Sequence, residues 1–243
     1  MAIAIYDVRL YTLPMNSDEL LARLLYRDAL MLVIDKPAGI PVHKGTGGGE
    51  NLEQHFEALR FGLPRTPALA HRLDRGTSGC LVLGRHRQAL HRLGKMFASN
   101  RIKKTYWAVV AGTPPQDEGT IDLPLAKQSE SSKRWWMKVE EGGQQAITHY
   151  KVMGRAEGIT WLEMEPKTGR THQLRVHAAA ISCPIIGDTI YGTQVTDDGP
   201  MLQLHARAIE IPLYPKKDPI TVTAPVPPHM EDFLQKCGYG KSK

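Results

Sequence analysis

The chain has 243 residues, of which 42% are hydrophobic and 23% charged, and its formal net charge is +6. This is the composition of an ordinary soluble globular protein with one large or two small domains, and the sequence lacks the ~18 consecutive apolar residues of a membrane span. Asp7 and Arg9 stand where a secretory signal would be apolar, and three widely spaced cysteines fit a reducing compartment, so we expect a cytoplasmic protein.

The hydrophobic pattern of the first hundred residues predicts one buried strand and two helices. Residues 1–23 form an N-terminal extension, and residues 17–25 fit either a capped helix or a loop that leads into a strand. An apolar run at 30–36, followed by Pro37, indicates a buried strand. Apolar side chains at helical spacing predict amphipathic helices at 51–60 and 87–99, the second with Leu90, Leu93 and Phe97 facing inward.

Strands dominate the rest of the chain. Apolar side chains at helical spacing predict one further helix over residues 171–181, and the mixture indicates an α+β protein with one continuous domain over 24–225 and a C-terminal tail at 226–243. The strands are predicted, from β-branched, aromatic or alternating residues, at 105–111, 147–153, 159–165, 202–211 and 220–223.

The positive charge is concentrated in one segment. Between Arg75 and Gln116 the sequence has no Asp or Glu. Such a segment fits a surface that meets a polyanion, and the alternative is a solvated basic helix face that binds nothing specific. Its basic residues are Arg75, Arg85, Arg87, Arg92, Lys95, Arg101, Lys103 and Lys104.

The segment His71-Arg72-Leu73-Asp74-Arg75 places one carboxylate between two arginines, directly before a Gly-Thr-Ser-Gly turn. Asp74 is therefore expected at the end of a regular element. Taken alone, it fits a helix cap or an ordinary ion pair with a neighbouring arginine. The serine hydrolase pattern Gly-x-Ser-x-Gly fails here, because Cys80 occupies its last position.

Other patterns indicate neither a metal nor a cofactor. The glycine-rich segment 45–50 matches neither the P-loop nor the dinucleotide fingerprint, and we interpret it as a mobile loop. The histidine pairs 86/91 and 172/177 are five residues apart, off the spacing of four that helical metal ligands use.

Five separated segments resemble the signature blocks of the RluA-type pseudouridine synthases, in the order of that family and over about residues 24–223. The resemblance implies an enzyme that isomerises selected uridines in RNA to pseudouridine without cofactor or metal. It also implies a single mixed, mainly antiparallel sheet with flanking helices and a central active-site cleft. The blocks are residues 35–39, 71–79, 103–112, 165–177 and 184–192.

The chemistry of isomerisation fits a carboxylate. The bond from ribose to the base nitrogen must break while the uracil is held, turned and rejoined through carbon, and Asp74 is the candidate covalent nucleophile. Whether it attacks the ribose or the uracil ring stays open. The resemblance assigns Arg170 as the guanidinium that favours the ionised carboxylate. Tyr106 matches the tyrosine on which the base stacks and which can handle a proton; the alternative is a strand tyrosine packed in the core.

The resemblance also assigns the residues that meet the rest of the RNA. Leu174 lines the pocket, although its spacing is equally that of any core leucine, and Arg72 fills the space that a flipped-out uridine leaves. Trp135 and Trp136 lie in a basic cluster that fits either stacking on RNA or a buried pair. The phosphate-binding track is Arg85, Arg87, Arg92, Lys95, Arg101, Lys103 and Lys104.

Only about twenty residues precede the first block, too few for the separate RNA-binding module of many family members. We therefore expect a monomer that recognises a short stem-loop of rRNA or tRNA with its catalytic domain. Two rival functions stay open. One is a catalytically silent RNA-binding or RNA-folding protein on the same scaffold, and the other is a nucleoside-cleaving hydrolase, for which no paired carboxylates are evident near Asp74.

Overall fold

The computed structural model describes residues 15–44, 48–128, 136–192 and 199–240. They fall into two compact units, the first formed by residues up to 104 and by 206–227, the second by residues 105–205 and the chain from 228 onward. Within the described ranges, no helix combines the length and apolar character needed to cross a membrane.

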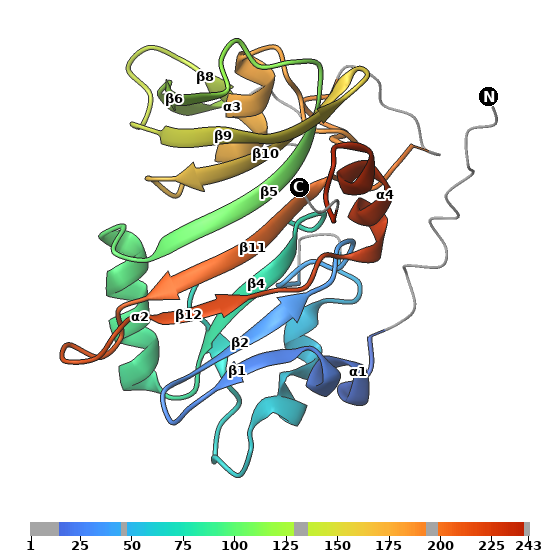
Figure 1. Ribbon diagram of the computed structural model, residues 1–243. Coiled ribbons are helices and arrows are strands. Elements are labelled where there is room, and N and C mark those ends of the chain that lie inside the picture. Colours follow the sequence, from blue (N-terminus) through green and yellow to red (C-terminus); the bar gives the residue numbers. More distant parts are fainter. Residues whose placement is uncertain (1–14, 45–47, 129–135, 193–198, 241–243) are drawn as a thin grey trace. The chain divides into compact units, whose positions relative to one another are not determined.

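The first unit is built on antiparallel strands and covered by helices (Figure 1). β1 (Leu24–Arg27), β2 (Met31–Lys36) and β4 (Ser78–Gly84) lie in that order, and the short β3 (Ala68–Leu69) also pairs with β4. β11 (Leu204–Ile211) pairs with β12 (Ile220–Thr223) through residues of this unit. The helices are α1 (Ser17–Ala22), α2 (Arg87–Ala98) and the 3-10 helix η2 (Leu52–Leu59).

Apolar side chains from both parts of the sequence close the core of the first unit. Val33 of β2 and Val82 of β4 are fully buried, and Leu93 of α2 packs into the same cluster. Ile209 and Val222 complete it from β11 and β12. Because all seven residues of β4 are buried, this strand shows no alternation of polar and apolar residues.

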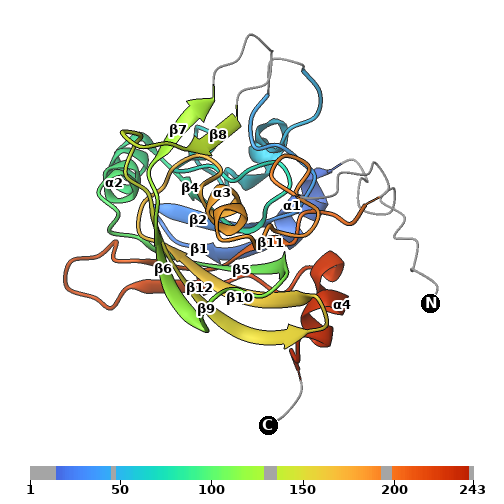
Figure 2. The ribbon, with the colours of Figure 1, turned by 90° about the horizontal axis from the view of Figure 1, so that it is seen from above.

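The second unit is a four-stranded antiparallel sheet with a small hairpin. Its strands follow the order β5 (Lys103–Ala111), β10 (Ile159–Pro166), β9 (Ile147–Ala156) and β6 (Glu118–Asp122), and β7 (Leu125–Gln128) pairs separately with β8 (Trp136–Val139). α3 (Gln173–Ala180) lies against one face of the sheet, where Leu174 and Ala178 join its core (Figure 2). The last helix is α4 (Pro228–Lys236).

The prediction of an α+β protein with mainly antiparallel strands is confirmed, and β12 has the predicted bounds. The predicted helix at 51–60 is 3-10 rather than α, and β1, β3, β4, β6, β7, β8 and α4 were not predicted. α2 buries Ala89 and Met96 beside Leu93, whereas Leu90 and Phe97 are only half-buried. Residues 1–14 of the extension, 45–47 of the glycine-rich loop and Trp135 lie outside the described residues, and the domain expected over 24–225 stays a prediction.

Like Gly84 in the same strand, Gly79 of β4 leaves no room for a side chain. Its φ is +103°, and a Cβ there would lie 2.3 Å from the carbonyl oxygen of Ala206. We expect Gly79→Ala to lower the free energy of unfolding by about 2 to 4 kcal/mol, from the strained backbone and the overlap together.

Gly94 is the matched control, because it lies in α2 and a Cβ added there would meet no neighbouring group within 4 Å. Gly94→Ala should stabilise the chain by about 0.5 to 1 kcal/mol. Urea unfolding of both variants measures the difference, and equal stabilities would contradict the packing described for β4.

Candidate active site

The predicted site residues are divided between the two units. Asp74 and Arg72 belong to the first unit, and Tyr106, Arg170 and Leu174 belong to the second. Each group is therefore positioned by the contacts of its own unit.

Asp74 lies in the irregular segment between β3 and β4, four residues before β4 begins. It is half-buried, and its carbonyl accepts a hydrogen bond from the Thr77 N–H (3.1 Å), which closes a turn. The Arg75 side chain is exposed and donates from Nε to the Gly39 carbonyl (2.7 Å), while the Gly39 N–H donates back to the Arg75 carbonyl (2.9 Å). Arg72 is exposed. The turn that carries Asp74 is thus attached to the loop after β2.

Lys36 fixes this turn from inside. Its side chain is fully buried at the end of β2, and Nζ donates to the carbonyls of Pro37 (2.8 Å), Arg75 (3.1 Å) and Thr77 (2.8 Å). Burial lowers the pKa of Lys36 to about 7, although the negative charges of Asp74 and Asp35 act in the opposite direction. Two of the three carbonyls, those of Arg75 and Thr77, closely follow Asp74 in the sequence. Lys36 was not among the predicted site residues. Its position at the end of an apolar strand could have indicated a buried amino group there.

His71 anchors the other end of the segment. Its Nε2 accepts the backbone N–H of Val82 in β4 (3.0 Å), and its ring stacks on Phe97 of α2 at 4.4 Å between centroids. Burial and, as a smaller cause, the positive charge of Lys104 together lower the pKa of His71 to about 3. The imidazole is therefore neutral near pH 7, as its acceptor role requires. Leu73 is buried as well, so the segment is held on both sides of Asp74.

Tyr106 and Leu174 belong to the same apolar cluster of the second unit. Tyr106 stands opposite Met164 in the pairing of β5 with β10, is half-buried, and packs against the same apolar cluster as Leu174 of α3. Two of the predicted site residues thus pack into one cluster of the second unit. The half-buried ring of Tyr106 fits a residue with one side in the core and one side accessible.

Arg170 is exposed just before α3. Its Nε donates to the Gln145 carbonyl (3.0 Å), and its backbone N–H donates to Oε1 of Gln173 (3.0 Å). Gln173 is itself buried in a polar network, with Oε1 accepting from the Thr168 hydroxyl (2.8 Å) and Nε2 donating to the Thr148 hydroxyl (3.0 Å). This network fixes how the turn at residues 168–170 leads into α3.

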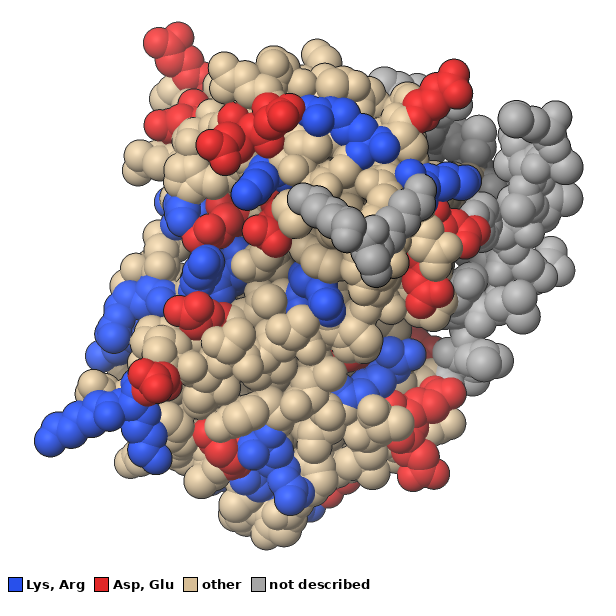
Figure 3. All heavy atoms as spheres, viewed as in Figure 1, with Lys and Arg blue, Asp and Glu red and all other residues tan. Residues whose placement is uncertain are grey.

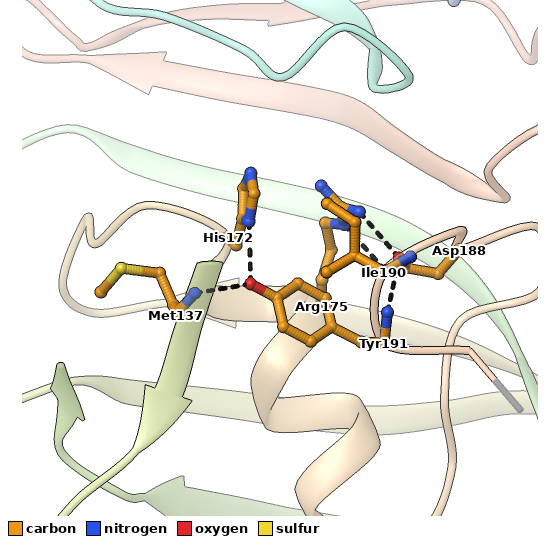
Figure 4. Close-up of polar contacts among 6 residues, drawn as sticks. All are labelled: Met137, His172, Arg175, Asp188, Ile190 and Tyr191. Atoms are coloured by element: carbon orange, nitrogen blue, oxygen red, sulfur yellow. Dashed lines mark hydrogen bonds and ion pairs between the residues drawn. The ribbon is translucent and has the colours of Figure 1, made fainter. Parts of the chain in front are cut away.

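Arg175, the third residue of α3, has a buried guanidinium group. It donates from Nε and Nη2 to the two carboxylate oxygens of Asp188, each at 2.7 Å. Oδ1 of Asp188 also accepts the backbone N–H groups of Ile190 (2.9 Å) and Tyr191 (3.0 Å), as Figure 4 shows. Burial alone would raise the pKa of Asp188, but the hydrogen bonds and charge of Arg175 and these N–H groups hold it below its usual range. This ion pair was not predicted from the sequence.

His172 and Tyr191 connect the start of α3 to β8. The Tyr191 hydroxyl accepts the backbone N–H of Met137 (2.9 Å) and lies 2.9 Å from Nδ1 of His172 (Figure 4). The hydroxyl keeps its own proton for donation, and Nδ1 of a neutral imidazole can accept it. His172 has φ +53°, a left-handed conformation that is uncommon for a residue with a side chain and that concentrates at functional sites.

The structure divides the predicted phosphate-binding track. Arg87, Lys95, Arg101 and Lys103 are exposed. Arg85 donates to the Asp28 carbonyl (2.5 Å), Arg92 donates to the Leu213 carbonyl, and burial lowers the pKa of Lys104. Trp136, the described member of the tryptophan pair, is 41% exposed, which removes the alternative of a buried pair for this residue.

Comparison with known proteins identifies related chains. A family model described as RNA pseudouridylate synthase matches residues 30–180. An uncharacterized RNA pseudouridine synthase of Zymomonas mobilis is 42% identical over 87% of this chain and 96% of its own length. A ribosomal large subunit pseudouridine synthase C of Buchnera aphidicola is 34% identical over 94% of this chain and 75% of its own length. The solved structure of human RNA pseudouridylate synthase domain containing 4 superposes with a TM-score of 0.75 at 25% identity, over 91% of this chain and 95% of that one.

Lys36→Met tests the role of the buried amino group. Methionine keeps an apolar stem of similar length but removes the donor from the carbonyls of Pro37 and Thr77, whereas the Arg75 carbonyl keeps the Gly39 N–H. We expect the free energy of unfolding to fall by about 3 kcal/mol or more, because each buried acceptor left unpaired costs about 1 to 3 kcal/mol. Guanidinium unfolding at pH 7 measures the change, and an unchanged midpoint would show that the three contacts contribute nothing.

Asp188→Asn tests the buried ion pair. The variant leaves the Arg175 guanidinium without its counter-charge, and we expect a loss of about 3 to 5 kcal/mol in stability at neutral pH. Because the folded pKa of Asp188 lies below its unfolded value, the pair contributes fully above about pH 4 and its contribution disappears as the pH falls through the folded pKa.

The difference between wild type and Asp188→Asn should therefore be constant from pH 7 to about 5 and shrink below about pH 4. Unfolding curves over this range give the measurement. A difference that grows on acidification would contradict the direction of the Asp188 pKa.

Proposed function

We propose a mechanism for this chain, which belongs to the RNA pseudouridylate synthase family. The chain is an RNA pseudouridine synthase, an isomerase that acts on uridine in RNA. In the proposed mechanism Asp74 is the nucleophile. The observation that carries this assignment is the way Asp74 is held, between the neutral His71 on one side and the carbonyls bound by Lys36 on the other.

The reaction breaks the bond from C1′ of the ribose to N1 of uracil and forms a bond from C1′ to C5. The hydrogen on C5 leaves as a proton and N1 gains a proton, so the product is an isomer and no oxidant or reductant takes part. Asp74 forms a covalent bond with the substrate while the glycosidic bond is broken, and it is released when the carbon bond is complete. A carboxylate fixed by its backbone can do this without reorganising.

Tyr106 and Leu174 are proposed to hold the uracil in this interval. Both belong to one apolar cluster of the second unit, so the ring would rest on a packed surface. The Tyr106 hydroxyl is also the proposed group that handles the C5 proton. The exposed Arg72 is proposed to occupy the gap left in the RNA by the flipped-out nucleotide.

The resemblance assigns the arginine that pairs with Asp74 to Arg170, and we propose Arg175 as a second candidate. Two hydrogen bonds to the Asp188 carboxylate orient the Arg175 guanidinium. The Arg170 side chain, in contrast, is exposed and donates to the Gln145 carbonyl. A preoriented guanidinium is the better partner for a carboxylate that must stay ionised, because less freedom is lost on pairing.

Large-subunit rRNA is the proposed substrate, because relatives at 34% and 37% identity are named ribosomal large subunit pseudouridine synthases C and D. A stem-loop of tRNA is the alternative. We propose that the chain acts as a monomer in the cytoplasm.

The nucleophile is tested with RNA labelled by tritium at C5 of uridine, since isomerisation releases that hydrogen to water. We expect Asp74→Asn to lower the rate of tritium release by at least about 10³-fold, the scale on which removal of a nucleophile acts. Asp35→Asn is the matched control, because Asp35 also interacts with Lys36 and its loss removes the same charge. It should release tritium within about threefold of the wild-type rate.

Equal rates in wild type and Asp74→Asn would refute the assignment, and release of free uracil would indicate a hydrolase. A folded wild-type protein that binds RNA but releases no tritium would favour the silent RNA-binding protein. The same assay distinguishes the arginines, because Arg175→Lys should reduce kcat more than Arg170→Lys if the preoriented guanidinium is the partner.

A further inference from the structure

The outer face of α2 carries a stripe of basic side chains. Arg87, His91 and Lys95 are exposed and follow one another at intervals of four residues, so they lie on one side of the helix. At 1.5 Å per residue the stripe is about 12 Å long. The opposite side of the helix is the one buried in the core, and α2 contains no acidic residue.

A second basic element lies in the same unit, in the turn between β11 and β12. Lys216 and Lys217 are exposed there, between Pro215 and Pro219. Both prolines restrict the backbone of the turn, and the Lys217 N–H donates to the Tyr214 carbonyl (3.1 Å). These two lysines were not among the RNA-binding residues predicted from the sequence.

The turn is attached to α2 and to the start of β2 by side-chain contacts. Arg92 of α2 donates to the Leu213 carbonyl, and the Tyr214 hydroxyl donates to the Asp28 carboxylate (2.8 Å). Arg85 donates to the Asp28 carbonyl (2.5 Å). Arg85 and Arg92 therefore fix the turn and α2 in place, and the other lysines and arginines of these elements remain exposed.

The exposed basic groups of these elements have few acidic neighbours. Lys and Arg side chains gather along the left edge of Figure 3, over α2 and the turn between β11 and β12 as Figure 1 locates them. Among the described residues, none of these groups lies within ion-pair distance of a carboxylate, and Asp218 is the one acidic residue of the turn. The members of this α2–turn surface are Arg87, His91 and Lys95 of α2, Arg101 and Lys103 directly after this helix, and Lys216 and Lys217 of the turn.

We propose that the α2–turn surface binds the phosphate backbone of structured RNA. The inference rests on the proposed function only in that RNA is the substrate. Because the contacts of Arg92, Tyr214 and Arg85 already fix the elements that carry these groups, little backbone freedom is lost on binding, and each phosphate contact releases counterions. The contacts carry no sequence information, so they strengthen binding and orient the RNA without selecting the uridine.

The test measures how RNA affinity depends on salt. The Lys216→Gln/Lys217→Gln variant should bind structured RNA more weakly, and its slope of log K against log salt should be smaller by about 1.5, since each phosphate contact contributes about 0.7 to 0.9. Adding Arg87→Gln and Lys95→Gln should lower the slope by about 3 in total. In turnover, KM for RNA should rise while kcat at saturating RNA stays within about twofold of wild type.

The matched control is Lys151→Gln/Lys236→Gln, which removes two exposed lysines of the second unit and gives the same net charge. Its slope should equal that of wild type. Equal slopes for all variants, equal falls in both double variants, or a fall in kcat with unchanged KM would overturn the proposal. A wild type that makes no pseudouridine while the slopes differ as expected would refute the proposed function and leave this surface standing.

Discussion

The Lys36 amino group is the interaction on which the rest of the candidate site depends. One nitrogen at the end of β2 binds three backbone carbonyls, two of them in the turn that carries Asp74. A backbone turn has many conformations, and a buried donor that engages it at several points selects one of them. Burial of a lysine is unfavourable in itself, which the lowered pKa expresses. The fold tolerates this because the same contacts position a carboxylate that has no helix or strand of its own.

The second unit uses a different arrangement for the same purpose. Arg175 and Asp188 form a buried ion pair with two parallel hydrogen bonds, and Asp188 also binds the backbone that leads to Tyr191. Tyr191 in turn contacts His172 and the backbone of Met137. Each of these side chains is held by a neighbour that is itself held by a further contact. A substitution at one residue should therefore shift the positions of several others. Such networks favour one geometry over nearby alternatives more than they favour overall stability.

Helices and strands were predicted accurately where the hydrophobic residues recur with the period of that element. Alternation predicted β12 to the residue, and the helical period placed α2 within one residue of its observed end. β4 was not predicted, because both of its faces are buried and its sequence therefore shows no alternation of polar and apolar residues. Its first residues, Ser78 and Gly79, also lack the apolar character of a buried strand. For the site, the residues could be named from the resemblance, but their surroundings could not. The bond from Lys36 to Thr77 and the pair of Arg175 with Asp188 join positions whose proximity only the folded backbone creates.

The division of the chain into units also bears on the order in which it folds during synthesis. The core of the first unit needs Ile209 and Val222, whereas most of its other members precede residue 103. At about 10 residues per second, a ribosome needs about 10 s to make the intervening segment. The apolar cluster of the second unit is drawn entirely from residues 106–204, so it is complete while the first unit still waits for its last two strands. We therefore expect the usual order of folding from the N-terminus to be reversed here, with the N-terminal strands being the part that chaperones must shield longest.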